Sequence, residues 1–373
     1  MISKWKSAAS FQNRCVMFNP NRLSLARKRR RLTGKGLSEL CGLTPVTISR
    51  LEKGLNEPEL ESLERMACAL RYPIDFFYGD DIEDIPAEAV SFRSLKKMSA
   101  KEREAAIAAG GLGLLVSDWV GERFNLPEVD FPVLDLSDPE AAAVAARQYW
   151  GLGEKPIGNM IKLLESKGVR VFSLAEQTKH VDAYSFWRDD VPFAFLNNFK
   201  TPEHSIFDCC HELGHLLLHR HQGPKHHRGA EYEANKFSSA FLMPRNDVIA
   251  HMPRFVTVDD IIKKKSRWRV SAMALAYRLR DVDVISDWQY RSICIELNRR
   301  DYRKSEPVGV EREASVIWKK VLSQLWLERI TKEDLASDIG IPFDELENLL
   351  FGITQEEVLH SYSGSRRGLR LVS

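Results

Sequence analysis

Hydrophobic and polar positions recur with the period of an α-helix over most of the chain, and residues 20–78 divide into five short helical segments. Gly42 separates the second segment from the third, and Thr44 with Pro45 forms a helix start, because threonine caps well and proline lacks only an amide that would be unpaired there. Two helices that cross through this turn would bury the apolar positions on either side of it. The pattern predicts a helix-turn-helix with the buried residues Leu37, Leu40, Ile48 and Leu51.

The middle of the chain combines longer helices with short strands. A capping box at Ser99 predicts a long helix, which Gly110, Gly111 and Gly113 are expected to interrupt. Three runs rich in Val, Phe and Tyr then predict a small antiparallel sheet whose last strand, residues 192–197, is the expected edge for an extended peptide. The predicted class is α+β, mainly α with a small antiparallel β-sheet. The strand-like runs are residues 169–174, 183–187 and 192–196.

Candidate chemistry lies in the stretch His211-Glu212-Leu213-Gly214-His215, within a helix predicted over residues 203–219. Positions i and i+4 share one helix face, so His211 and His215 can offer two imidazole nitrogens to one Zn²⁺ ion. Glu212 would lie beside the water that such an ion activates. The spacing is typical of a zinc metallopeptidase in which Glu212 is the catalytic base.

A catalytic zinc ion takes three protein ligands and keeps one open position. The next predicted helix, residues 229–244, offers Glu231 as the expected third ligand and Glu233 as the alternative. Asn235 lies one turn after Glu231, where its side chain could hydrogen-bond a ligating histidine and orient it. A purely structural zinc site would need four protein ligands, and the sequence places three near the cleft.

Three stretches carry a resemblance to the ImmA/IrrE metallopeptidase family, over roughly residues 90 to 307. They are FDCCHELGHLLLHRH, EYEANKFSSAFLMP and RWRVSAMALAYRLRDVDVISDWQYRSICIELNRRDYRKSEP. The resemblance implies a zinc peptidase that cleaves a repressor protein after a stress or mobile-element signal, and fused forms are often found beside toxin genes. Family members commonly have Asp where this chain has Asn235.

Further polar groups accompany this region. Tyr277 or Arg278, on a following helix, could supply the oxyanion donor that peptide hydrolysis uses, with packing as the alternative role for each. Cys209 and Cys210 are expected to pack beside the helix, although a thiol next to His211 could sense oxidants. A second histidine cluster is expected to be a solvated loop rather than a metal site, and it consists of His219, His221, His226 and His227.

Composition narrows the class of protein. With 44% hydrophobic and 28% charged residues and no apolar run near the roughly 18 residues of a membrane span, the 373-residue chain is predicted to be soluble, with two or three domains and no membrane partner. Residues 1–16 lack the apolar segment of a secretory signal, and the six cysteines show neither a paired framework nor CxxC spacing. A cytoplasmic location with reduced thiols is therefore expected.

The net charge of +2 conceals a strong local asymmetry. Residues 22–53 hold nine Lys and Arg against two Glu, while residues 57–88 hold ten Asp and Glu against two Arg. This arrangement favours a module with one face toward a polyanion, and a solvated helix face is the alternative. In a DNA complex the third helix would enter the major groove. The expected contacts are Pro45, Val46, Thr47 and Arg50 near the bases, and Arg27, Lys28 and Arg31 near the phosphates.

The stretches LSELCGLTPVTISRLEKG and EPELESLERMACALRYPIDFFYGD resemble the XRE, or lambda-repressor-like, helix-turn-helix family over about sixty residues. The resemblance implies a regulator that binds a double-stranded DNA operator, and we expect a homodimer. Gly34-Lys35-Gly36 stands where the family usually has a glutamine that contacts phosphate or base. The alternative is a helix-turn-helix fold used only for protein contact or dimerisation.

The carboxy-terminal part predicts a second, degenerate helix-turn-helix over residues 331–351, with Gly340 at the turn and Pro342 at a helix start. Its acidic side chains repel phosphate, so a contact role is expected rather than DNA recognition. The predicted domains are an N-terminal arm (1–18), a helix-turn-helix domain (19–80), a linker and helical connector (81–140), a metallopeptidase domain (141–305) and a C-terminal helical domain with tail (306–373).

The combined prediction is a DNA-binding transcriptional regulator with a zinc-dependent endopeptidase domain. Its expected substrate is a repressor or antitoxin-type protein, or the chain itself, in a stress, mobile-element or toxin-antitoxin response. The alternative is an antitoxin or transcription factor whose peptidase-like domain senses a ligand or binds a partner, such as a toxin, without proteolysis.

Overall fold

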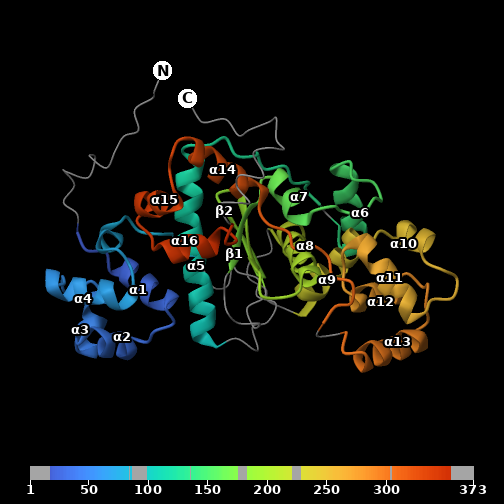
Figure 1. Ribbon diagram of the computed structural model, residues 1–373, viewed down its shortest axis with the longest axis horizontal. Helices are drawn as coiled ribbons and strands as arrows, with labels where there is room; N and C mark the ends of the chain where they lie inside the picture. The colour runs from blue at the N-terminus through green and yellow to red at the C-terminus, as the bar shows by residue number, and fades with distance from the viewer. Residues whose placement is uncertain are drawn as a thin grey trace, which may run out of the picture. The chain divides into compact units, whose positions relative to one another are not determined.

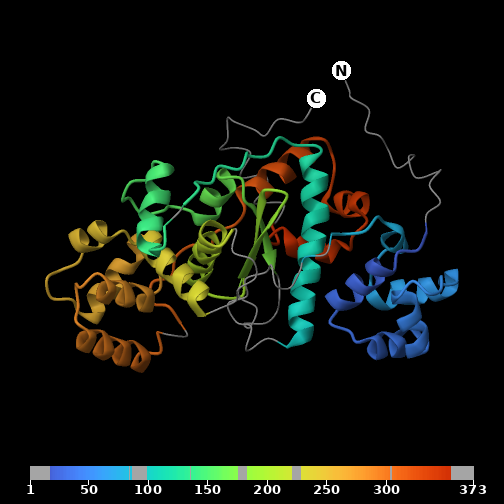
Figure 2. The same ribbon diagram turned by 180° about the vertical axis from the view of Figure 1, so that it is seen from behind.

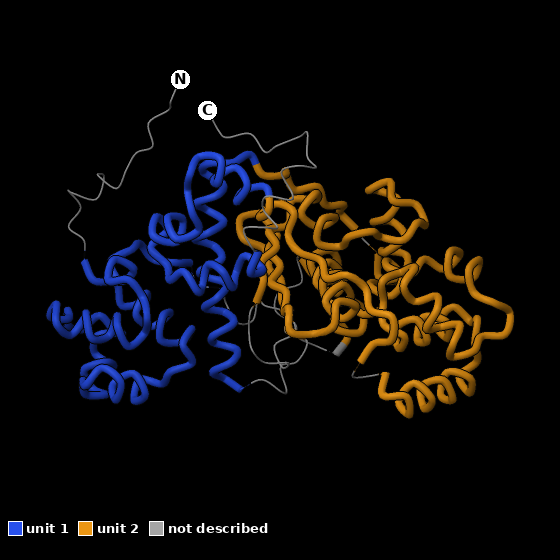
Figure 3. The backbone as a smooth tube through the Cα atoms, viewed as in Figure 1, with its two compact units in different colours: residues 1–85, 97–125, 320–373 blue, residues 86–96, 126–319 orange. Residues whose placement is uncertain are grey.

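The computed structural model describes residues 17–83, 85, 99–134, 136–174, 183–220, 228–302 and 305–353. These residues are mainly α-helical with one three-stranded sheet, which confirms the predicted α+β class. The chain forms two compact units (Figure 3). Among the described helices none is long and apolar enough to cross a membrane. Unit 1 comprises Met1–Ile85, Lys97–Asn125 and Lys320–Ser373, and unit 2 comprises Pro86–Lys96 and Leu126–Lys319.

The first helices of unit 1 follow the predicted capping signals. Thr33 caps the second helix, whose C-terminal residue is followed by Gly42 in the left-handed region at φ 67°, a conformation that glycine adopts without strain. The Thr44 side chain accepts a hydrogen bond from the backbone N–H of Thr47, the third residue of the next helix, as a helix cap should. The elements are α1 (Pro20–Arg29), α2 (Gly34–Cys41), α3 (Pro45–Glu52), α4 (Leu60–Leu70) and the 3₁₀ turn η2 (Ile74–Tyr78).

Leu37, Ile48 and Leu51 are buried between these helices, as predicted, but Leu40 is not. Its side chain is 61% exposed. The stripe that α2 buries runs through Leu37, Ser38 and Cys41, so Leu40 falls on the solvent side of the helix. The helix-turn-helix is thus present with a narrower apolar stripe than the sequence predicted.

The long helix α5 (Ala100–Gly121) begins at the predicted capping box, in which Ser99 and Glu102 bond each other's backbone. The predicted interruption at Gly110, Gly111 and Gly113 is wrong, because the helix continues through all three glycines. A Cβ atom on Gly111 would lie 3.2 Å from side-chain atoms of Ile82 and Leu25. The glycine therefore permits α1 to pack closely on α5, and burial in this contact outweighs the low helix propensity of glycine.

Three helices near the carboxyl end repeat the layout of α1 to α3, namely α14 (Val316–Leu327), α15 (Lys332–Ile339) and α16 (Phe343–Leu349). Thr331 caps α15 as Thr33 caps α2, and Gly340 follows α15 at φ 78° as Gly42 follows α2, with a separation of 298 positions in both pairs. The second helix-turn-helix predicted from the sequence is therefore present, and its cap and turn glycine match those of the first at a constant separation in sequence. Buried residues that correspond at this separation are Leu37 and Leu335, Ile48 and Leu346, and Leu51 and Leu349.

The sheet of unit 2 has the order β1-β3-β2, formed by β1 (Arg170–Leu174), β2 (Ala183–Arg188) and β3 (Val191–Asn197). It is mixed, not antiparallel as predicted, because β1 pairs in parallel with β3. The chain reverses direction between β1 and β2 and again between β2 and β3, so β3 runs in the same direction as β1. Because β3 lies between β1 and β2, it pairs in parallel with β1 and antiparallel with β2. The predicted peptide-binding edge is also wrong: β3 is central, and its apolar residues are covered on both faces.

Helix α8 lies against β2 and β3, and α9 packs on α8 (Figures 1 and 2). A Cβ atom on Gly214 would lie 3.2 Å from the Cα atom of Ala234, so the glycine allows these two helices to cross closely. This crossing brings the histidine motif of α8 beside α9. The helices of unit 2 are α6 (Pro139–Tyr149), α7 (Met160–Ser166), α8 (Pro202–Leu218), α9 (Arg228–Leu242), α10 (Arg245–His251), α11 (Val258–Trp268), α12 (Ala272–Asp281) and α13 (Asp287–Arg299).

Candidate metal centre

Helix α8 carries the histidine motif and is buried on several faces. Thr201 caps its start and Pro202 occupies the first turn, the arrangement that both residue types favour. One face packs on the sheet, and the motif residues are themselves buried, with His211 at 0% and Glu212 at 1% exposure. An apolar stripe along this helix is buried, and it consists of Ile206, Cys210, Leu213 and Leu217.

Three side chains converge where α8 crosses α9. The Nε2 atoms of His211 and His215 are 3.0 Å apart. The two carboxylate oxygens of Glu231, from α9, lie 3.3 Å from these nitrogens, one oxygen on each. All the candidate ligand atoms lie within 4.8 Å of one another, so the three residues could hold one metal ion.

The spacing fits a tetrahedral zinc ion. Bonds of about 2.0–2.1 Å at tetrahedral angles place neighbouring ligand atoms roughly 3.3 Å apart. Burial raises the pKa of the Glu231 carboxyl, but hydrogen bonds and charge from His211 and His215 outweigh it, so the pKa falls far below its usual range. The described residues bring together two imidazoles and one carboxylate, and a set of three such ligands is typical of a catalytic zinc site, whereas a structural site has four.

Glu212 is held by a residue that the sequence did not reveal. The hydroxyl of Ser185, on β2, donates to Glu212 Oε2 at 2.6 Å, and both side chains are buried. Ser185 precedes Glu212 by 27 positions and reaches it only because α8 packs on the sheet. No spacing rule in the sequence could have identified this contact.

The two residues predicted around Glu231 take different places. Asn235 donates from Nδ2 to the backbone oxygen of Glu231 at 2.7 Å, and not to a histidine ring as expected. Glu233 points to another partner: its Oε2 atom lies 2.9 Å from Nε2 of His219. In turn, His219 Nδ1 lies 3.1 Å from Nδ1 of His215. The geometry therefore favours Glu231 over Glu233 as the third ligand.

On the helix-turn-helix, the residues expected to contact bases gather on the outer side of α3. Pro45, Val46 and Arg50 are exposed. Thr47 is partly buried, and its hydroxyl shares a hydrogen bond with Thr44 at 2.9 Å. The side chains that would reach into a groove are thus presented together on the first turns of one helix.

The residues expected near phosphates differ among themselves. Arg27 pairs with Glu52 at 2.6 Å and also donates to the backbone oxygen of Leu32, so its guanidinium ties α1 to α3. Lys28 and Arg31 are partly buried, and Arg31 has a left-handed backbone at φ 56°. These contacts give Arg27 a structural role, and the phosphate contacts of Arg27, Lys28 and Arg31 stay predictions.

Comparison with known protein families gives a match for the region of the metal centre and for the helix-turn-helix. Residues 164–280 match the peptidase family model described as the IrrE N-terminal-like domain. Residues 23–77 match a helix-turn-helix model. The chain joins a helix-turn-helix domain to an IrrE-type domain. Among curated proteins nothing matches the chain. The two family matches confirm both resemblances and support a DNA-binding regulator that carries a peptidase-like domain.

The predicted oxyanion donors, Tyr277 and Arg278, lie on α12, near the end of the matched residues 164–280. Arg278 is buried, donates from Nε to the Met243 backbone oxygen at 2.9 Å, and pairs with Glu140 at 2.8 Å and Asp281 at 3.1 Å. The ring of Tyr277 packs on Tyr290. The structure thus gives both side chains packing partners, the alternative role that the sequence left open.

The remaining cysteine and histidine predictions concern reactivity. Cys209 and Cys210 are fully buried, and burial raises the pKa of both thiols well above their usual range. A protonated, buried thiol reacts slowly with oxidants, so packing accounts for both residues. Of the second histidine cluster, His219 alone is described; His221, His226 and His227 lie outside the described residues.

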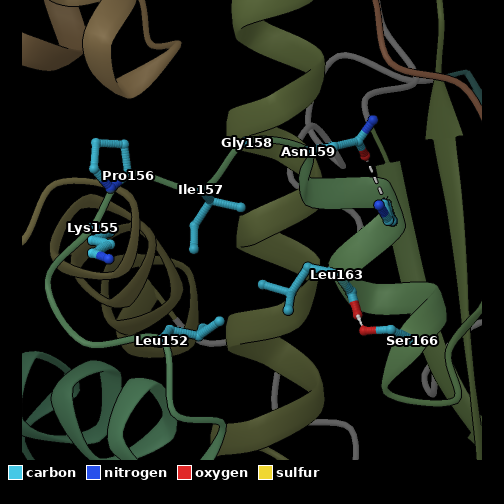
Figure 4. Close-up of a pocket in the computed structure, with 9 residues that line it drawn as sticks. Leu152, Lys155, Pro156, Ile157, Gly158, Asn159, Leu163 and Ser166 are labelled. Carbon is cyan, nitrogen blue, oxygen red and sulfur yellow. Dashed lines mark hydrogen bonds between the residues drawn. The ribbon is translucent and has the colours of Figure 1, made fainter.

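A separate pocket of about 280 Å³ lies between residues 152–158 and α7 (Figure 4). Leu152, Ile157 and Leu163 face one another across it, and its lining contains none of the three candidate metal ligands. Its lining is mainly apolar, and the polar side chains in it, Lys155, Asn159, Lys162 and Ser166, include no carboxylate or imidazole. The candidate chemistry of the IrrE-type domain is therefore at the crossing of α8 and α9.

Proposed function

We propose that this protein is a DNA-binding transcriptional regulator whose IrrE-type domain is a zinc-dependent endopeptidase. The meeting of His211, His215 and Glu231 at tetrahedral ligand spacing carries the proposal. The adjacent Glu212 supplies a carboxylate on the same helix turn. Such a set needs only a metal ion and a water molecule to hydrolyse a peptide bond.

The roles of the residues follow from this arrangement. When bound, a zinc ion would polarise the scissile carbonyl and acidify a nearby water molecule. Glu212 takes the proton of the attacking water and later passes it to the leaving amine. Ser185 fixes the orientation of the Glu212 carboxylate by donating to Oε2. His211, His215 and Glu231 hold the ion on the side of α8 that faces α9.

The proposed substrate is a protein segment in extended conformation. Among the described strands β2 pairs on one side only, with β3, so its other side is an edge to which a peptide strand can add. Because β2 also carries Ser185, a peptide on this edge would run beside Glu212. We propose a repressor or antitoxin-type protein, or the chain itself, as the substrate, in a stress, mobile-element or toxin-antitoxin response.

The helix-turn-helix domain is proposed to bind a double-stranded operator through Pro45, Val46, Thr47 and Arg50 of α3, with Lys28 near a phosphate. The three exposed residues of this set lie on one side of α3, which supports the assignment. We further propose a cytoplasmic homodimer, since such modules read paired half-sites.

The test combines metal content with proteolysis. The wild-type chain is expected to purify with about one zinc ion and to cut its protein substrate, because three ligands leave one open position. Glu212→Gln should keep the zinc and lose cleavage by about 10²–10⁴-fold, because the proton acceptor is removed. His204→Asn is the matched control, since this histidine on the same helix bonds Thr201 at the helix start.

Two outcomes would redirect the proposal. A wild-type protein that holds zinc but cuts neither itself nor any neighbouring repressor or antitoxin would contradict the peptidase assignment. If operator binding and neutralisation of a partner then persist in Glu212→Gln, the IrrE-type domain is a ligand sensor or partner-binding domain, the alternative function.

A further inference from the structure

Beside the ligand triad lies a pair of residues that the proposed chemistry does not use. His219 follows the last residue of α8, and Glu233 belongs to α9. Their side chains are joined by the contact of 2.9 Å between His219 Nε2 and Glu233 Oε2. On its other side the His219 ring lies 3.1 Å from His215, Nδ1 to Nδ1. A continuous line of contacts therefore runs from a carboxylate to a candidate metal ligand.

The proton positions along this line follow from the metal. A histidine binds a metal ion through a nitrogen that carries no proton, so Nε2 of metal-bound His215 is bare and its Nδ1 carries the proton. That Nδ1 donates, so Nδ1 of His219 must accept, which leaves the His219 proton on Nε2. Nε2 then donates to Glu233, whose ionised carboxylate can only accept. One arrangement of protons satisfies all three side chains.

We propose that His219 and Glu233 are positioning residues that orient His215 and set the metal affinity of the site. The inference rests on the proposed function, because it takes the triad as a metal centre. Partners of this kind raise the basicity of the ligand nitrogen and fix its ring, and their loss typically weakens metal binding about 10–100-fold.

The other histidine of the triad lacks such support. His211 Nδ1 is buried and has no hydrogen-bond partner within the described part of the chain. The orientation of the ligand pair therefore depends on the His215 side, where the line of contacts reaches the surface. The side chains become more exposed along it, from 8% at His215 to 12% at His219 and 37% at Glu233. Substitution at the outer end consequently removes a contact without leaving a buried cavity.

The experiment measures metal binding by the full-length chain, independently of proteolysis. Metal-free protein is titrated with Zn²⁺ and with Co²⁺ in competition with a chromophoric chelator. His219→Phe should weaken both metals about 10–100-fold and shift the Co²⁺ absorption bands, because the ligand ring is no longer held. Glu233→Gln keeps an acceptor oxygen but loses the charge, so its effect should be smaller. His204→Asn should bind both metals as the wild type does.

The double variant tests whether the two residues act in series. If Glu233 acts only through His219, the affinity of the double variant equals that of His219→Phe alone. Additive losses, or wild-type affinity and spectra in both single variants, overturn the proposal. If His219→Phe does not fold, Glu233→Gln at its exposed position decides the matter alone. A wild-type chain that binds neither ion at micromolar concentration instead overturns the proposed function, so the two failures are distinguishable.

Discussion

At the scale of single residues, the contact between Ser185 and Glu212 leads to a direct prediction. Ser185→Ala removes the donor to the Glu212 carboxylate, and cleavage should fall about tenfold or more, since hydrogen bonds to charged groups contribute roughly 1.5–3 kcal/mol. Zinc content should stay unchanged, because the Ser185 hydroxyl bonds Glu212, which is not one of the candidate ligands. The measurements are kcat on a protein substrate and metal analysis of the same sample.

A second buried serine provides the control. Ser173, on β1, is buried, accepts a hydrogen bond from the Asn198 side chain at 2.6 Å, and is not one of the candidate metal ligands. Ser173→Ala should therefore leave kcat near the wild-type value. Equal losses in both variants would mean that the sheet, and not the hydrogen bond to Glu212, determines the effect.

The contrast between His211 and Ser185 shows which parts of the site the sequence could predict. His211 and His215 lie one turn apart on a helix, so local periodicity is enough to place them on one face. The choice of Glu231 over Glu233 depends on how α9 is rotated against α8, and two residues on one helix cannot be separated by spacing alone. Ser185 depends on the packing of a strand against a helix, which no local pattern encodes.

At the scale of elements, the sheet and α5 show how tertiary packing overrides local signals. Strand-forming runs were predicted near their observed positions, but the insertion of β3 between β1 and β2 is a non-local pairing. Gly111 favours a break in a helix by propensity, yet it allows a close approach of α1 that a larger residue would block. The elements were therefore predictable, and their partners were not.

Two glutamates of unit 2, Glu165 and Glu313, each cap the start of a helix about 150 positions away in the sequence, and this predicts a stability effect. Glu165 of α7 accepts from the backbone N–H groups at the start of α14 at 2.9 and 3.1 Å, and Glu313 accepts from those at the start of α7 at 2.7 and 3.1 Å. Glu165→Ala leaves the part-buried N–H groups of Val316 and Ile317 without their carboxylate acceptor, which costs roughly 1–3 kcal/mol. Urea unfolding followed by circular dichroism measures the difference.

An exposed glutamate of the same unit calibrates this prediction. Glu154 is exposed and accepts a hydrogen bond from the Asn246 side chain at 2.6 Å. Glu154→Ala should change the free energy of unfolding by less than about 0.5 kcal/mol. If Glu165→Ala changes the free energy of unfolding equally little, the Glu165 carboxylate does not stabilise the start of α14 as its hydrogen bonds indicate.

At the scale of the whole molecule, unit 1 is assembled from chain segments that are far apart in sequence. Glu345 of α16 pairs at 2.7 Å with Arg29, the last residue of α1, and at 3.0 Å with Arg30, which follows it. At the separation of 298 positions, Asp344 and Glu345 correspond to Val46 and Thr47 of α3. The second helix-turn-helix thus carries acidic residues at the positions where the first is proposed to read DNA, and uses them to hold α1.

This arrangement explains why linear domain boundaries are a limited description of the chain. Boundaries such as 306–373 follow from composition and helix signals along the sequence, and they remain predictions. The unit that contains α1 also contains α15 and α16 (Figure 3). The acidic side chains of residues 331–351 predicted that this segment makes protein contacts and does not bind DNA. The charge pattern alone could not identify the basic residues at the end of α1 as the partners.

Removal of the carboxylate of Glu345 should therefore weaken the DNA-binding module. Glu345 is 1% exposed, and removing one partner of a buried ion pair typically costs about 3–5 kcal/mol, so Glu345→Ala should unfold unit 1 at lower temperature and weaken operator binding. Asp344→Ala is the control: this neighbour pairs with Arg30 at 2.8 Å, but its side chain is 55% exposed, so the loss should stay within about 1 kcal/mol. Calorimetry and hydrogen exchange of α1 report the stability, and zinc content should remain constant because the triad lies wholly in unit 2. Wild-type exchange rates in Glu345→Ala would show that α1 is held without the acidic helix.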